Sequence, residues 1–154
     1  NNPVNAKIGF QTTHSINITD NDLPVVTFAK KSVTVKENAG ILKVKLKINN
    51  GSTSATNVKV AVKTKSDSTF IPMDFKMGSN NVDTTVRFPG NKVVDSLEFN
   101  VYLQNDGRSE DRSDTVILVL RNPTSPAIAG ADSLMMLIIE DDELEFGTYV
   151  GDQS

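Results

Sequence analysis

Alternation with a period of two residues is the feature that most constrains the fold of this 154-residue chain. Over residues 42–48, four aliphatic side chains alternate with three lysines. Because successive side chains of a β-strand point to opposite faces, this pattern predicts a strand with one buried face and one face in water. The Asn50-Gly51 pair that follows favours a tight hairpin, and valines alternating with lysines and alanine over 58–63 predict the second strand.

Similar apolar patterns recur along most of the chain, and no stretch shows helical periodicity. The expected strands are 25–28, 32–35, 42–48, 58–63, 85–88, 97–103, 116–120 and 134–139. In 116–120 and 134–139 the apolar residues are consecutive, which is typical of strands covered on both faces. A set of about seven short strands separated by turn residues predicts an all-β fold, a sandwich of two antiparallel sheets.

Composition narrows the classes of function. With 38% hydrophobic and 23% charged residues the chain has the composition of a globular protein, and no apolar run approaches the roughly 20 residues of a membrane-spanning helix. A net charge of −3 argues against nucleic acid as a partner. The absence of cysteine and the single histidine, His14, leave little material for zinc sites, thiol chemistry or acid–base catalysis. We therefore expect no enzyme, no catalytic residues and no membrane insertion.

The two ends of the chain carry similar stretches in the same order, with a one-residue difference in length. Asn2-Pro3, Ile8, Gly9, Ile16, Ile18, Asp20, Asn21, Asp22 and Leu23 correspond to Asn122-Pro123, Ile128, Gly130, Leu137, Ile139, Asp141, Asp142, Glu143 and Leu144. Such a match indicates an internal repeat. It predicts that 1–22 is the C-terminal strand remnant of a preceding repeat, that 23–143 is a complete sandwich domain, and that 144–154 is a linker or the start of the next domain.

Two kinds of partner follow from this division. The first is the set of neighbouring repeats of the same parent chain. The second arises because 1–22 has the pattern of a strand without a sheet of its own, and such a strand tends to pair with an exposed sheet edge. We therefore expect it to add to an edge of its own molecule or of a neighbouring one, and in the second case to give a concentration-dependent dimer.

The ionisable chemistry of the sequence is carboxylate chemistry, concentrated in the predicted loops and strand ends. The acids are Glu37, Asp74, Asp106, Glu110, Asp111, Asp114, Glu140, Asp141, Asp142, Glu143 and Glu145. Alternate loops of a sandwich return to the same pole, so several of these acids are expected to converge there. Like charges brought together in this way need a neutralising cation. Ca²⁺ is the best candidate, because it takes 6–8 hard oxygen ligands, whereas transition metals favour histidine or cysteine.

Several motifs in a fixed order resemble the Calx-β domain. They are Val35 to Gly40, Met73-Asp74-Phe75, the acidic loop leading into Asp114-Thr115-Val116, Asn122-Pro123 and Asp141-Asp142. The resemblance covers Val25 to Glu143 and implies an immunoglobulin-like sandwich without catalysis, in an adhesion-type protein at the cell surface or in the extracellular space. The Ca²⁺ ligands that it implies are Glu37, Asp74, Asp106, Glu110 or Asp111, Asp114, Asp141 and Asp142. The sequence departs from the family pattern at Asp114 (a glutamate is usual), Gly107 (an acid is usual) and Glu143 (an aspartate is usual).

Other functions remain open beside calcium binding. The acids at 140–145 also fit a solvated linker, and those in the loops also fit hydrogen bonding to the backbone. The same fold without metal would be a spacer or a module that binds a protein or surface ligand, by its sheet edges or by lysines 43, 45, 47, 59, 63 and 65, which we expect on one outer face. Carbohydrate binding is disfavoured, because the chain has no tryptophan and only two tyrosines, Tyr102 and Tyr149.

Overall fold

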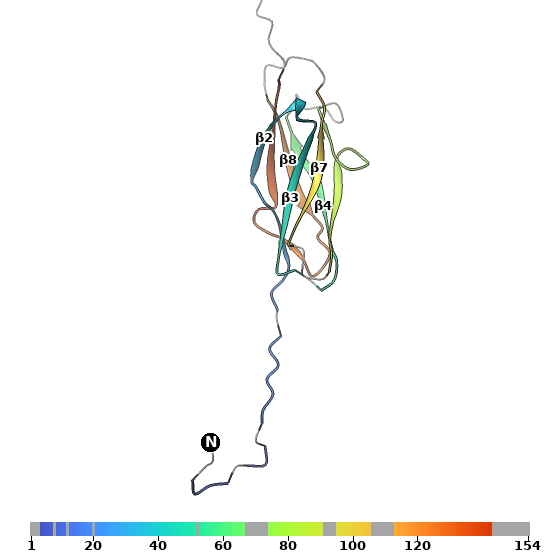
Figure 1. The fold of residues 1–154 in the computed structure, drawn as a ribbon. Helices are drawn as coiled ribbons and strands as arrows, with labels where there is room; N and C mark the ends of the chain where they lie inside the picture. Colours follow the sequence, from blue (N-terminus) through green and yellow to red (C-terminus); the bar gives the residue numbers. More distant parts are fainter. Residues whose placement is uncertain are drawn as a thin grey trace, which may run out of the picture.

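Two five-stranded sheets face each other across an apolar core (Figure 1). The structure, a computed structural model, describes residues 4–7, 9–11, 13–19, 21–51, 53–66, 74–90, 95–105 and 113–142. Sheet A has the order β5 (Phe75–Lys76), β7 (Ser96–Leu103), β3 (Ile41–Asn49), β1 (Val25–Phe28) and β9 (Ile128–Ala129). Sheet B has the order β2 (Ser32–Lys36), β10 (Leu134–Glu140), β8 (Asp114–Arg121), β4 (Thr56–Lys65) and β6 (Asp83–Phe88).

The alternating residues supply the core from both sheets. In β3, Val44, Leu46 and Ile48 are buried while the lysines between them are exposed, and in β4 Val58 and Val60 are buried in the same way. All eight expected segments are strands, which confirms the all-β sandwich. The described residues contain ten strands rather than about seven, because β5 and β9 have two residues each and are too short to show a period.

The predicted hairpin at Asn50-Gly51 is wrong. Asn50 does have a positive φ of 53°, but β3 pairs with β1 and β7 whereas β4 pairs with β6 and β8. The chain therefore crosses from one sheet to the other after β3. A positive φ marks a change of direction and leaves the pairing partner undetermined. Here both strands direct their apolar faces into the core from opposite sides.

Two expectations about the outer faces are also wrong. Every second residue of β8 between Thr115 and Val119 is only half-buried, and Leu134 and Met136 in β10 are exposed, so these strands are fully covered on one face only. The six lysines do not share a face: those at 43, 45 and 47 lie on β3 of sheet A, and those at 59, 63 and 65 lie on β4 of sheet B.

The first strand of the domain is divided between the two sheets. β1 pairs with β3 and β9, the chain crosses over at residues 29–31, and β2 then pairs with β10 in parallel. Because parallel strands end on the same side, the ends of β2 and β10 lie together, and the short 3₁₀ helix η1 (Glu37–Ala39) follows β2 there. This end of the sandwich is the upper end in Figure 1.

The described residues of the N-terminal segment extend away from the sandwich beyond the end at which β1 begins (Figure 1). They form no strand, and the side chains of Ile16 and Ile18 are 79% and 93% exposed. Pairing with an edge of the same molecule is therefore not seen in the described part of 1–22. Residues 144–154 lie outside the described residues. Nowhere in the described ranges is there a helix with the length and apolar character needed to cross a membrane.

Burial of alternate side chains of β3 in the core can be tested by mutation. Leu46→Ala should lower the free energy of unfolding by about 2–5 kcal/mol, because it removes a fully buried side chain between the two sheets. Ile41→Ala, on the same strand but exposed, is the matched control and should change stability by about 0.5 kcal/mol or less. Denaturant unfolding measures both. Equal losses in the two variants would contradict the assignment of the inward face of β3.

Candidate functional site

The strand register brings predicted ligand residues to one end of the sandwich, here called the acidic pole. Lys36 lies opposite Glu140 in the parallel pair, so Glu37 and Asp141 leave the sheet as neighbours. Asp114 lies opposite Ile139 in the antiparallel pair of β8 and β10, which places the start of β8 at the same end. The acidic pole therefore comprises residues of three adjacent strands or their extensions.

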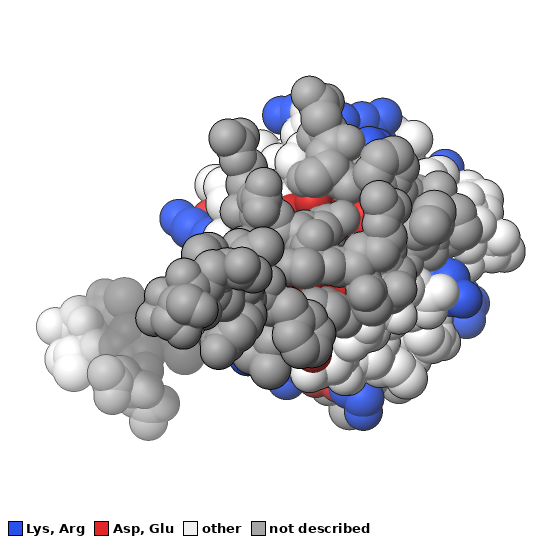
Figure 2. Space-filling view, turned by 90° about the horizontal axis from the view of Figure 1, so that it is seen from above, with Lys and Arg blue, Asp and Glu red and all other residues white. Residues whose placement is uncertain are grey.

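Two further connections place Asp74 at this end. The backbone N–H of Gln104 donates to the carbonyl oxygen of Asp74 at 2.9 Å, and that of Leu103 donates to the carbonyl of Gly40 at 2.8 Å. The end of β7 thus joins residue 74 of sheet A to the turn that contains Glu37. Figure 2, viewed onto this end, shows acidic residues in red near the middle and basic residues in blue towards the periphery.

Three of the carboxylates are buried. Glu37, Asp74 and Asp114 expose 5%, 4% and 1% of their surfaces, although aspartate and glutamate are rarely buried without compensation. The hydroxyl of Ser66 donates to Asp114 Oδ1 at 3.4 Å and accepts the backbone N–H of Thr115 at 3.0 Å. These positions combine a low-dielectric environment with negative charge from two different sheets.

The second oxygen of two of these groups is also buried. Within the described structure, Glu37 Oε2 and Asp114 Oδ2 accept no hydrogen bond, although other interactions engage both residues. Carboxylate oxygens are among the hard oxygen ligands that Ca²⁺ takes. The donor set at the pole is therefore compatible with Ca²⁺ in its chemistry.

Asp142 has a different environment. The side-chain amide of Asn38 donates to its Oδ2 at 2.5 Å, and the amide of Asn105 donates to its Oδ1 at 3.3 Å. These three residues, here called the amide clasp, connect η1, the residues after β7 and the residues after β10. Reasoning from charge missed the two asparagines, because an uncharged amide gives no electrostatic pattern. The position of Asn38 directly after Glu37 is the signal that the sequence does contain.

The predicted ligand set is assembled only in part. Asp106, Glu110 and Asp111 lie outside the described residues. Among the residues that the structure describes, no group of three or more histidine, cysteine, aspartate or glutamate side chains is arranged to hold a metal ion. Glu37, Asp74, Asp114, Asp141 and Asp142 thus share one pole without forming a closed coordination shell.

The amide clasp generates a second prediction. In a double-mutant cycle, Asn38→Ala and Asp142→Ala should show a coupling free energy of about 0.5–1 kcal/mol, because each removes one partner of the same charge-assisted hydrogen bond. Denaturant unfolding in the presence of a chelator supplies the four stabilities. Asn38→Ala combined with Asp132→Ala is the control, since Asp132 precedes β10 at its other end, and its effects should simply add. Additivity in both cycles would mean that the clasp contributes nothing.

The comparisons with known proteins concern structure rather than sequence. No protein-family model and no curated protein sequence matches the chain. The apo-form Calx CBD1 domain matches with a TM-score of 0.67 and 19% identity over 79% of this chain and 100% of that chain. The calcium binding domain CBD12 of CALX1.1 matches with a TM-score of 0.64 and 20% identity over 76% of this chain and 45% of that chain. For the Calx CBD2 domain the values are 0.62 and 10%, over 77% and 87%.

The identities are low, so the likeness concerns the fold. It agrees with the two-sheet architecture and with the fold expected from the order of the motifs. The chain therefore has the fold of the Calx CBD1 and CBD2 domains, which is the Calx-β sandwich.

Proposed function

We propose that this chain is a non-catalytic structural repeat of a secreted or cell-surface protein, and that it binds Ca²⁺ through carboxylates at the acidic pole. The observation that carries the proposal is the burial of Glu37, Asp74 and Asp114 at one end of the sandwich. A buried carboxylate opposes folding unless hydrogen-bond donors or a cation compensate it, and three of them at one end therefore favour a cation there.

Charge neutralisation is the physical role of the ion. Carboxylates from the two sheets repel one another in a poorly hydrated environment, and a divalent cation converts this repulsion into attraction. The donors at the pole are hard oxygens, with neither thiolate nor imidazole among the described residues there, and such a set favours Ca²⁺ over transition metals. Glu37, Asp74, Asp114 and Asp141 would contribute ligands, and Asp106 with Glu110 or Asp111 would complete the shell.

The structural likeness supports the same proposal. One of the solved structures with this fold is that of a calcium binding domain, CBD12 of CALX1.1. In the present chain, ion binding would order the connections at the acidic pole and stiffen the exit of β10. Since Asp141 and Asp142 follow β10 directly, stiffening there would limit movement between this domain and a following repeat of the parent chain.

A metal-free module is the second candidate function. The amide clasp favours it, because Asn38 and Asn105 already hold both oxygens of Asp142 by hydrogen bonds that need no ion. In that case the acidic pole would be closed by amide donors, and the domain would act as a spacer or would bind a protein or surface ligand by its sheet edges.

Thermal unfolding with and without Ca²⁺ separates the two functions. At a Ca²⁺ concentration a hundredfold above Kd, the ion should stabilise the folded chain by about 2.7 kcal/mol, because it binds only the folded state. A clear rise in Tm relative to the same protein in chelator is therefore expected. An unchanged Tm at millimolar Ca²⁺ would favour the metal-free module.

A matched pair of variants locates the ion. Asp114→Asn keeps the shape of a buried side chain at the pole and should abolish the Ca²⁺-dependent shift in Tm. Asp132→Asn removes a half-exposed carboxylate that pairs with Lys31 before β10, and it should leave the shift intact. If both variants kept the full shift, Ca²⁺ would bind elsewhere on the chain.

A further inference from the structure

A groove opens on the side of the sandwich where the first strand changes sheets. β1 follows β3 only from Asn49 to Leu46, and the last bond of this ladder runs from the N–H of Ala29 to the carbonyl of Lys45 at 3.0 Å. The chain then crosses to sheet B and continues as β2. The half of β3 from Ile41 to Val44 is left with β7 on one side and no described strand on the other.

The backbone groups along this half of β3 are oriented for strand addition. The backbone carbonyl of Gly40 accepts a hydrogen bond from the N–H of Leu103, and the N–H of Ile48 donates to the carbonyl of Asp95, so both residues bond towards β7. Because bonding alternates along an antiparallel ladder, even-numbered residues of β3 face β7 and the odd-numbered Ile41 and Lys43 direct their N–H and C=O groups to the open edge. On the other side of the groove β2 is itself the edge of sheet B.

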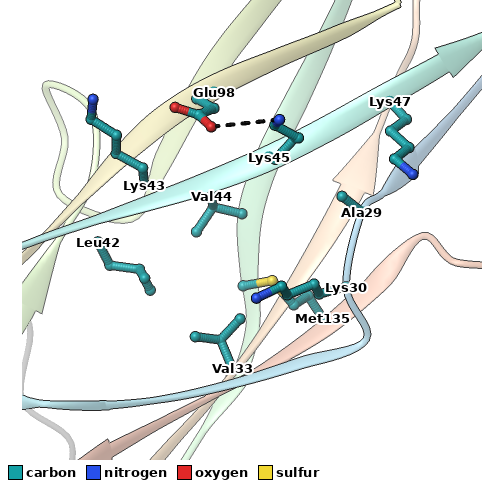
Figure 3. A pocket seen from close by; sticks show the side chains of 10 residues that line it. All are labelled: Ala29, Lys30, Val33, Leu42, Lys43, Val44, Lys45, Lys47, Glu98 and Met135. Atoms are coloured by element: carbon teal, nitrogen blue, oxygen red, sulfur yellow. Dashed lines mark ion pairs between the residues drawn. The ribbon is translucent and has the colours of Figure 1, made fainter.

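The groove has an apolar floor and a basic rim (Figure 3). Its volume is about 470 Å³, within the range of small ligand sites. Val33, Leu42, Val44 and Met135 provide the apolar side chains, and Lys30, Lys43, Lys45 and Lys47 provide positive charge. Glu98 is the one acid among the lining residues, and it pairs with Lys45 at 3.9 Å. The rim therefore carries a net positive charge.

The open backbone edge, the apolar floor and the basic rim together indicate what kind of segment the groove would bind. An extended segment would extend the hydrogen-bond ladder of β3, alternate apolar side chains would enter the floor, and acidic residues beside the strand would meet the lysines. An open edge of this kind favours addition of a further strand, and the lysines disfavour a segment without negative charge.

The chain itself contains a segment with these properties. Residues 15–19 read Ser-Ile-Asn-Ile-Thr, with Ile16 and Ile18 on one face of an extended chain, and Asp20 and Asp22 follow directly. Both isoleucines are almost fully exposed, which is unfavourable for two β-branched apolar side chains on one face. The segment therefore has the pattern of a strand with one apolar face, and it is followed by acids that the lysine rim would attract.

We infer that the groove between β2 and β3 of one copy takes residues 15–19 of a second copy as an added strand of sheet A. A second copy fits better than the same copy, because the described N-terminal residues extend away from the sandwich past the end where β1 begins (Figure 1). A segment folding back would also have to pass β1, which already occupies the lower half of this edge. Reciprocal exchange between two copies would bury four isoleucines.

Cross-linking tests the placement directly, since the chain has no cysteine and every disulfide must join introduced thiols. One copy of the 154-residue chain carries Ile18→Cys and a second copy carries Leu42→Cys, in the groove floor. Mixed under mild oxidation, they should form a disulfide-linked heterodimer in high yield. The matched control replaces Leu42→Cys by Ile128→Cys, an exposed position on β9 next to the start of β1, at the opposite end of the sandwich from the open half of β3, and should give little product.

The oligomeric state provides an independent readout. Light scattering over a concentration series should show a dimer, and Ile16→Asn with Ile18→Asn should weaken it by about tenfold or more, because two buried side chains are lost. Lys43→Glu should weaken it by about tenfold through repulsion with the acidic flank, whereas Lys63→Glu, an exposed lysine on sheet B, should not.

Two results would overturn the inference. One is a strict monomer at every concentration. The other is a cross-linking yield that does not depend on the intended pairing. This would be seen if Ile128→Cys gave as much heterodimer as Leu42→Cys. It would also be seen if a single chain carrying both Ile18→Cys and Leu42→Cys formed the disulfide internally with the same yield.

Discussion

The transfer of the first strand from sheet A to sheet B is the constraint on which the rest of the structure depends. β1 covers only the lower half of the β3 edge, and β2 completes sheet B beside β10. The parallel pairing of β2 and β10 makes both strands end at the same pole, which brings Glu37 next to Asp141. The early end of β1 leaves the upper half of β3 open. One crossover of three residues thus creates both the acidic pole and the lateral groove.

Negative charge at the acidic pole can be compensated in two ways, by hydrogen-bond donors or by a cation. The carboxylates of Glu37, Asp74 and Asp114 are buried, and a buried charge opposes folding unless donors or a cation compensate it. The amide clasp shows the first solution at Asp142, with a neutral donor on each oxygen. It lies at the exposed rim of the pole. The deeper acids have the chemistry for the second solution, in which an ion replaces many separate donors.

Sequence periodicity predicted the strands well because it reports the burial of alternate side chains, and burial does not depend on the neighbouring strand. For the same reason it could not assign strands to sheets, as the error at Asn50-Gly51 shows. The convergence of Glu37, Asp74 and Asp114 was predictable from the order of the motifs, since loops at one pole recur at alternate turns. Asn38 and Asn105 were not, because their role depends on distances between three separate connections. Asp106, Glu110 and Asp111 lie outside the described residues, so their proposed role stays a prediction.

The predicted internal repeat bears on the proposed addition of the N-terminal segment to the groove. Ile16 and Ile18 correspond to Leu137 and Ile139, which are fully buried on the inner face of β10. A segment with this pattern is able to bury one face against a core, whichever sheet receives it. The lysine rim would then select among strands that could add to the open edge, rather than exclude all of them. It would penalise addition of uncharged strands to the open edge, and it would attract a strand that is followed by acids such as Asp20 and Asp22.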